Sequence, residues 1–153
     1  MALIRQARPE DADAILTMAR ALAEHVGDPP PASKVRQFVD DCFGPKRWFE
    51  CFVAEHQNEL VGFVSVSRAA EVHTGNRRLW IGDLYVAPRA RRFGVARDLL
   101  RAVVGRGREL NCSAIYWEVW RSNELGSAFF QAIRSNALED LTIMRLDVDR
   151  LDL

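Results

Sequence analysis

Residues 84–100 read LYVAPRARRFGVARDLL, and this stretch joins an apolar strand to an amphipathic helix through a basic turn. Such a turn points several main-chain N–H groups at one place, and the unpaired N–H groups and dipole of the first helical turn attract an anion. Gly94 and Ala96 carry little side-chain bulk, so a phosphate can approach the main chain closely. The stretch therefore predicts a pyrophosphate site, to which positive charge is added by Arg91, Arg92 and Arg97.

The two commonest phosphate-binding motifs are missing from this stretch. The chain has no GxxxxGK[ST] run, which argues against hydrolysis of nucleoside triphosphates. No GxGxxG follows the strand, which argues against a dinucleotide fold. Taken alone, the stretch is also compatible with a surface helix that begins with Arg and Gly for no functional reason.

Hydrophobic periodicity places further elements on both sides of this turn. Strands are expected at 2–8, 48–55, 60–67, 79–86, 112–120 and 141–148. Helices are expected from Pro9 to Gly27, from a Ser33 cap to Cys42, and at 94–110 and 124–136. Helices that interrupt a mostly antiparallel run of strands predict an α/β or α+β layered sheet. No linker or repeat divides the chain, so we expect a single domain over residues 1–153.

Composition narrows the class of partner. The chain has 21 basic and 21 acidic residues, so its formal net charge of zero favours neither nucleic acid nor an anionic membrane as a partner. Its three cysteines are widely spaced and form no CxxC pair, which predicts neither a metal site nor a disulfide framework. The first residues lack an apolar secretory core, and we expect a cytoplasmic protein.

The segment 91–96 resembles the [Q/R]-x-x-G-x-[G/A] signature of the GNAT acetyltransferases. Its flanks fit as well, with Val86 and Pro88 before it and two leucines after it. The family's first strand is similar to residues 4–7, and its central hairpin is similar to residues 53–63. A later segment of the family is matched by Val119, Asn123 and Phe129, with Gly126 at the position of a small Ala. Within the superfamily the chain looks closest to the diamine acetyltransferase-like branch, on the basis of Phe43-Gly44, residues 83–86, Trp117 and Asn123-Glu124.

The resemblance implies a fold and a cofactor. The GNAT fold is a mixed, mostly antiparallel twisted sheet of six to seven strands with about four helices. Its central strand pair splays apart, and the pantetheine arm of acetyl-CoA lies in the gap. No metal is implied. The matching cofactor-binding positions are Leu84, Tyr85, Val86, Arg91, Arg92, Phe93, Gly94, Val95, Ala96, Arg97, Asn123, Phe129 and Phe130.

Two of these positions, Asn123 and Tyr85, allow a second interpretation. Asn123 is a candidate both for a cofactor contact and for a helix N-cap, because Asn is a favoured cap and a helix follows. Tyr85 is expected to point away from the side of Leu84 and Val86, because side chains alternate along a strand.

The candidates for catalysis are Asp83, Tyr116 and Glu118. Asp83 would bind or deprotonate the amine, or would simply accept hydrogen bonds at the strand end. The related branch has a second carboxylate just before it, where this chain has Gly82. Glu71 and His73 are further acid–base candidates.

The family commonly has Tyr at the position of Phe130, where it protonates the leaving thiolate. Phe cannot do so, and solvent or Tyr116 would have to serve instead.

The resemblance therefore implies an N-acetyltransferase that transfers an acetyl group from acetyl-CoA to a small primary amine, either amino-acid-like or a diamine. The alternative, motivated by Phe130, is a catalytically weak acyl-CoA-binding regulatory module. We expect a homodimer that binds neither nucleic acid nor membrane.

Overall fold

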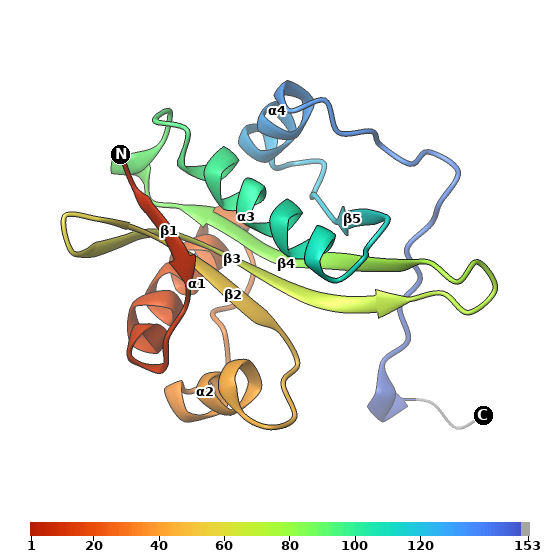
Figure 1. Ribbon diagram of the computed structural model, residues 1–153, viewed down its shortest axis with the longest axis horizontal. Helices are drawn as coiled ribbons and strands as arrows, with labels where there is room; N and C mark the ends of the chain where they lie inside the picture. The colour runs from red at the N-terminus through yellow and green to blue at the C-terminus, as the bar shows by residue number, and fades with distance from the viewer. Residues whose placement is uncertain (151–153) are drawn as a thin grey trace.

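Five strands form one open sheet in the computed structural model, which describes residues 1–150 (Figure 1). The strands lie in the order of the chain. β1, β2, β3 and β4 pair antiparallel, and β5 joins the edge of β4 in parallel. The mixed, mostly antiparallel sheet predicted from the sequence is thus confirmed. The bounds of the strands are β1 Leu3–Gln6, β2 Glu50–His56, β3 Glu59–Ala70, β4 Arg77–Val86 and β5 Ala114–Trp117.

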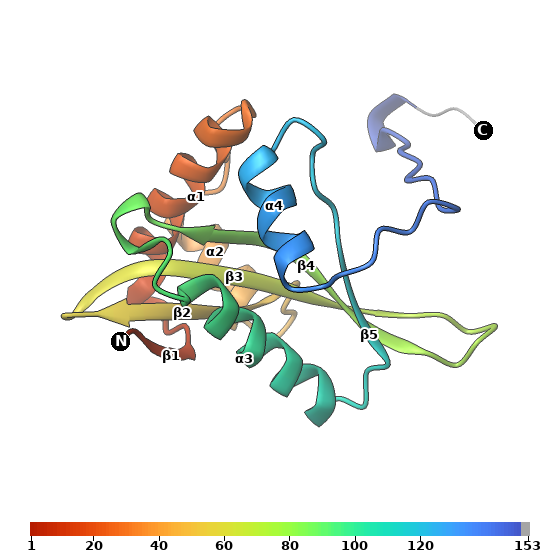
Figure 2. The same ribbon diagram turned by 90° about the horizontal axis from the view of Figure 1, so that it is seen from above.

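Helices cover both faces of this sheet, with α1 and α2 on one face and α3 on the other (Figure 2). Among residues 1–150, no helix combines the length and the apolar run that crossing a bilayer requires. The α-helices are α1 Ala12–Val26, α2 Val35–Phe43, α3 Val95–Glu109 and α4 Glu124–Ala132. Short 3-10 turns are η1 Pro9–Asp11, η2 Pro88–Ala90 and η3 Val148–Arg150.

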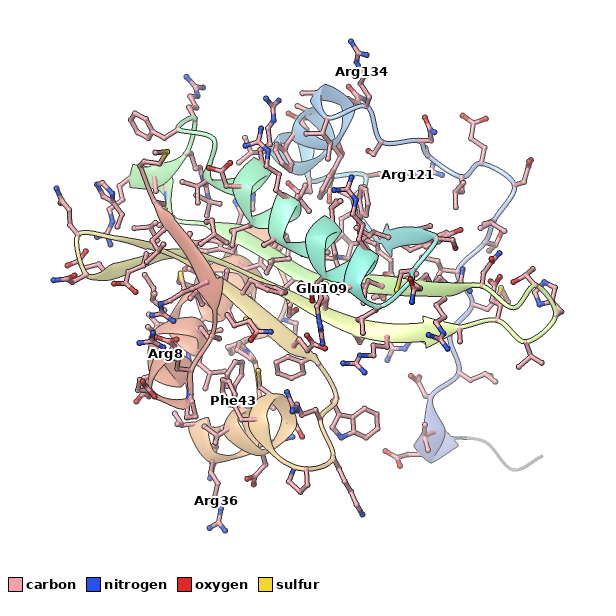
Figure 3. The ribbon with its side chains drawn as sticks, viewed as in Figure 1. Arg8, Arg36, Phe43, Glu109, Arg121 and Arg134 are labelled. Carbon is pink, nitrogen blue, oxygen red and sulfur yellow. The ribbon has the colours of Figure 1, made fainter. Side chains whose placement is uncertain are left out.

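Each face of the sheet buries its own apolar cluster. On one face, Ile15 of α1 and Phe38 of α2 pack against the sheet. The opposite side of α2 faces outward, where Figure 3 shows Arg36. On the other face, Leu99 and Val103 of α3 are fully buried. Apolar residues three and four positions apart on a helix share one face, which explains why the sequence periodicity located these helices.

The sheet has fewer strands than the six to seven expected, and the strand expected at 141–148 is wrong. Residues 141–147 have no regular secondary structure, and 148 begins a 3-10 turn. The side chains of Leu141, Ile143, Met144 and Leu146 are all exposed. A strand requires a hydrogen-bonded neighbour, and apolar alternation alone does not provide one.

Several other boundaries also differ from expectation; β3, for example, continues to Ala70 instead of 67. β5 ends at Trp117 instead of 120, because its pairing with β4 stops there. Helix α4 ends at Ala132 instead of 136, and Arg134 has a left-handed φ of 60°, which a helix cannot continue through. Lys34, not Ser33, occupies the cap position of α2, without a side-chain hydrogen bond.

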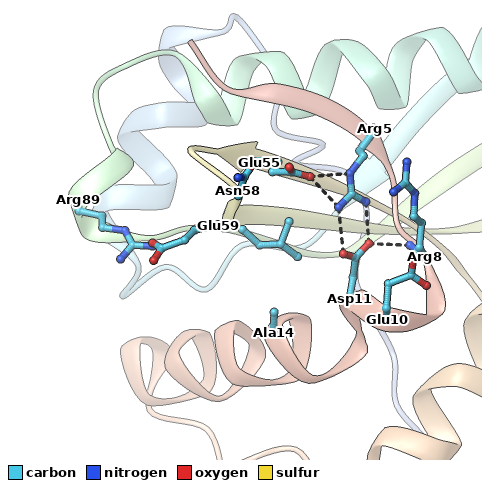
Figure 4. A pocket seen from close by; sticks show the side chains of 10 residues that line it. Arg5, Arg8, Glu10, Asp11, Ala14, Glu55, Asn58, Glu59 and Arg89 are labelled. Carbon is cyan, nitrogen blue, oxygen red and sulfur yellow. Dashed lines mark hydrogen bonds and ion pairs between the residues drawn. The ribbon is translucent and has the colours of Figure 1, made fainter.

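An ion-pair network ties β1 to the start of α1 and to β2 (Figure 4). The guanidinium of Arg5 donates to both Asp11 oxygens at 2.7 and 3.0 Å, and it also pairs with Glu55 at 2.8 Å. The main-chain N–H of Arg8 donates to Asp11 Oδ2 at 2.7 Å. The hydrogen bonds from Arg5 lower the pKa of the Asp11 carboxyl, and they outweigh its burial, which acts in the opposite direction.

We expect acid to remove the stabilisation that Asp11 provides. A carboxyl whose pKa is lower in the folded chain stabilises fully above its unfolded value of about 3.9, and this contribution disappears as pH falls through the folded pKa. The variant Asp11→Asn should lose about 2 kcal/mol at pH 7, while the gap to wild type should shrink near pH 3. Urea unfolding at both pH values measures this, with Asp13→Asn on the exposed side of α1 as the control. A gap that is independent of pH would contradict the assignment.

Candidate functional site

The turn between η2 and α3 holds two residues in left-handed backbone conformations. Arg92 has a φ of 66°, and Gly94, which caps α3, has a φ of 83°. Left-handed residues interspersed in a turn direct neighbouring N–H groups toward a common point, and such concavities bind anions. Among the described residues, no main-chain or side-chain acceptor takes a hydrogen bond from the N–H groups of 93–97. These donors are available to a ligand.

Charge around the turn favours an anion. The first turn of the 15-residue helix α3 contributes the positive end of its dipole. Arg92 and Arg97 are exposed beside it. Arg91 is held in place, because its Nε donates to the carbonyl of Val86 at 2.9 Å. The side chain of Phe93 is 80% exposed, so that the protein does not cover the turn.

Strands β4 and β5 diverge next to this turn. β4 pairs with β5 only from Arg78 to Ile81, and within residues 1–150 no strand pairs with the rest of β4 on that edge. The N–H of Ala87 donates to Val61 on β3, so alternation directs the main-chain groups of Leu84 and Val86 toward the gap. The hydrogen bond from Arg91 to the Val86 carbonyl lies on this gap side. The gap therefore offers an unpaired strand edge that runs into the anion-binding turn.

A β-bulge determines where Asp83 lies. Ser65 pairs with Asp83, but the next residue of β3 pairs with Ile81, so that Gly82 is an extra residue in β4. The bulge shifts the alternation by one position. Leu79, Ile81 and Val86 pack on the α3 face, whereas Tyr85 packs with α1 and α2. Asp83 shares the face of Tyr85, two positions away.

The Asp83 carboxyl has one edge open to solvent and one polar neighbour. The residue is exposed, but the protein packed around it removes part of its water and raises the pKa of the carboxyl. A hydrogen bond from Ser65 Oγ to Asp83 Oδ2 at 3.1 Å acts in the opposite direction. An exposed carboxyl whose pKa is raised is suited to binding an ammonium or accepting a proton.

The other acid–base candidates lie in different surroundings. Tyr116 pairs with Trp80, and its ring stacks on the Arg78 guanidinium, whose carbon lies 4.7 Å from the ring centroid. Glu118 is exposed just beyond β5.

Glu71 and His73 are far from Asp83. They lie on the turn that follows β3, and Glu71 pairs with Arg78. Glu71 lies six residue steps beyond Ser65 along β3, which is about 20 Å at the usual rise per residue. The structure does not bring these two side chains to Asp83.

Asn123 is an N-cap, and Phe130 belongs to an aromatic cluster. Asn123 Oδ1 accepts a hydrogen bond from the N–H of Gly126 at 3.0 Å. A Cβ on Gly126 would lie 2.7 Å from Asn123 Nδ2, which explains the glycine at this position. The Phe130 ring lies 4.9 Å from Trp117 of β5 and 5.3 Å from Phe129, centroid to centroid. The cluster fixes α4 beside the end of β5.

Neither thiol behind the site is suited to nucleophilic attack. Cys51 and Cys42 are both 3% exposed. Burial raises the pKa of Cys42 to about 11 and raises that of Cys51 well above its usual value. Buried thiols of high pKa are unreactive. In the part of the chain that the structure describes, no group of three or more His, Cys, Asp or Glu is arranged to hold a metal ion.

Sequence reasoning missed Ser65 and the bulge at Gly82. A serine on a central strand is an unremarkable residue, and its role depends on pairing with a strand 18 residues away. The only local sign was Gly82 itself, since a glycine within a strand pattern often marks a bulge.

Comparisons with known proteins give a matching family model and several solved structures of the same fold. The sequence model of the acetyltransferase (GNAT) family matches residues 15–133. A ribosomal-protein-alanine N-acetyltransferase from Brucella melitensis biovar Abortus 2308 superimposes with a TM-score of 0.77 at 21% identity, covering 96% of this chain and 100% of that one. A probable acetyltransferase gives a TM-score of 0.80 at 22% identity, with 95% and 97% covered. An aminoglycoside acetyltransferase from an uncultured soil metagenomic sample, solved with sisomicin, gives a TM-score of 0.78 at 15% identity, with 96% of each chain covered.

Proposed function

The chain belongs to the acetyltransferase (GNAT) family, and we propose that it transfers an acetyl group from acetyl-CoA to the primary amine of a small molecule, by direct attack in a ternary complex. Bound acetyl-CoA supplies the activated thioester. The observation that carries the proposal is the continuous surface formed by the unpaired edge of β4 and the free N–H groups at the start of α3. Positioning two substrates side by side accounts for a large part of the rate, so no covalent enzyme intermediate is needed.

The cofactor is held mainly by main-chain groups in this proposal. The N–H groups of 93–97 bind the pyrophosphate, and Arg92 and Arg97 add charge beside it. The gap-side edge of Leu84 and Val86 hydrogen-bonds the pantetheine arm as an added strand would. The remaining expected positions, Tyr85, Asn123, Phe129 and Phe130, stay predictions: Tyr85 is buried on the opposite face, and Asn123 caps α4.

Asp83 acts on the acceptor amine. Its carboxyl lies on the α1 and α2 face, next to the unpaired part of β4, where it can anchor an ammonium and take its proton directly or through water. The N–H of Val86 faces the gap and is placed to stabilise negative charge that develops on the thioester oxygen. Tyr116 and Glu118 are secondary candidates, and Tyr116 is occupied by its stack on Arg78.

The acceptor is a small amine of the diamine or amino-acid-like class. A single carboxylate matches a single ammonium, and the position before Asp83, where the related branch has a second acid, is Gly82. One similar protein is an aminoglycoside acetyltransferase solved with sisomicin, whose substrate class also carries amines. The likeness to the diamine acetyltransferase-like branch is part of this proposal.

Thiol release on a panel of amines tests the proposed reaction. We expect release of CoA from acetyl-CoA to rise at least tenfold above background with some primary amine of the panel. Phe130 motivates a second candidate, because its ring cannot donate a proton to the leaving thiolate. Tight CoA binding by calorimetry with no release on any amine would favour this second candidate, a regulatory acyl-CoA-binding module.

We also propose a cytoplasmic homodimer. Exposed apolar side chains at Leu141, Ile143, Met144 and Leu146 support self-association, because such a run is costly to leave in water. Light scattering distinguishes a dimer from a 17.4 kDa monomer.

A further inference from the structure

Ser65 contacts Asp83 through two hydrogen bonds that involve the same hydroxyl. Ser65 Oγ accepts from the main-chain N–H of Asp83 at 2.9 Å, and it donates to Asp83 Oδ2 at 3.1 Å. Because the lone pair faces the N–H, the hydroxyl proton is directed to the carboxylate. Ser65 is 8% exposed, so water does not compete freely for these bonds. Because one bond is to the main chain of Asp83 and the other to its side chain, the two bonds together fix the orientation of the Asp83 carboxylate relative to β4.

The bulge and the serine depend on each other. A Cβ on Gly82 would lie 3.0 Å from Ser65 Oγ, closer than ordinary contacts allow. A side chain at 82 would therefore press on the hydroxyl that holds Asp83. In a regular ladder without the bulge, Gly82 would pair with Ser65, and Asp83 would then share the α3 face with Ile81. Gly82 and Ser65 together turn the carboxylate to the α1 and α2 face.

From this arrangement we propose that Ser65 is a positioning residue, which fixes the Asp83 carboxylate toward the acceptor and favours its ionised form. The inference rests on the proposed function of Asp83. A hydrogen bond donated to a carboxylate stabilises the charged form and lowers its pKa. Here it opposes the effect of burial, which raises the pKa of Asp83.

The other ionisable groups near Asp83 do not take over the role of Ser65 as hydrogen-bond donor to its carboxylate. Cys51 of β2 pairs with Ser65 from the far side and is a buried thiol of raised pKa. Tyr85 lies on the same strand and is buried, and Tyr116 of β5 stacks on Arg78. Glu118 follows β5 and is exposed. Cys42 of α2 belongs to the same buried cluster and is also a thiol of raised pKa. The pKa of Asp83 is shifted by burial and by the hydrogen bond from Ser65.

Titration of the Asp83 carboxyl by carbon NMR tests the inference without any need for activity. The Asp83 signal is identified as the one lost in Asp83→Asn. We expect Ser65→Ala to raise the pKa of Asp83 by about one pH unit, the effect of losing one hydrogen bond to a charged group. The acid limb of kcat/KM should move to higher pH by the same amount, with the affinity for CoA unchanged.

Ser67→Ala is the matched control. Ser67 lies two residues further along β3, on the same face, and pairs with Trp80 instead of Asp83. Ser67→Ala should change neither the pKa of Asp83 measured by NMR nor the acid limb of kcat/KM. Ser65→Thr should retain most of the wild-type pKa of Asp83, because threonine keeps the hydroxyl. An unshifted pKa in folded Ser65→Ala would overturn the inference, whatever the enzyme does. A shifted pKa in a chain that acetylates no amine would instead overturn the proposed function and leave the positioning role of Ser65 standing.

Discussion

Gly94→Asp should weaken binding of CoA by about 100-fold or more, which corresponds to the loss of about two charge-assisted hydrogen bonds. Gly94 has a φ of 83°, and a Cβ there would project into open space, where we place the pyrophosphate. Aspartate tolerates the left-handed conformation better than most residues, and its charge suits a helix N-terminus. The variant should therefore fold, while its carboxylate repels the phosphates. Calorimetry with CoA measures the change.

Gly27→Asp is a matched control for this variant. Gly27 caps the C-terminus of α1, has a φ of 80°, and also has open space around the position of a Cβ. Gly27→Asp places the same charged residue in the same left-handed backbone conformation as Gly94→Asp, but it lies away from the anion-binding turn. Its affinity for CoA should stay within about twofold of wild type. Equal affinities in the two variants would mean that the start of α3 does not bind the cofactor, and the transferase proposal would lose its main support.

Asp83→Asn should lower kcat by about 10²- to 10⁴-fold, the range that general acid–base groups contribute. Affinity for CoA should not change, because the proposed CoA contacts are main-chain groups on the gap-side edge of β4 and at the start of α3. Stability should not fall either. A carboxyl whose pKa is raised by folding destabilises the native state once pH exceeds its unfolded value, and the amide removes that effect. Steady-state kinetics together with urea unfolding at pH 7 separate these quantities.

The control Asp13→Asn removes an exposed carboxylate from the first turn of α1 and should keep full kcat. If Asp83→Asn retained more than about a third of wild-type turnover, Asp83 would be a structural hydrogen-bond acceptor within β4 and nothing more. Glu118→Gln would then be the next variant to measure, since Glu118 is exposed just beyond β5.

Local patterns located the elements but not all of their partners. The sequence predicts helix α3 at 94–110, and it spans Val95–Glu109, because the apolar stripe and the glycine before it are both local signals. The segment 141–148 carries a similar apolar pattern, yet it forms no strand, because pairing depends on a neighbour that the pattern does not specify. The length of β5 also depends on its partner, because the strand ends where its pairing with β4 ends.

The sequence by itself determined the strand, turn and helix around Gly94, because a glycine cap, a basic turn and an apolar helical stripe act over a few residues. Only the tertiary structure decided which way Asp83 points. Its direction depends on the bulge at Gly82 and on the hydroxyl of Ser65, and that contact joins residues 18 positions apart. Pairing across a sheet is set by the register of whole strands, so it cannot be read from either residue's own neighbours.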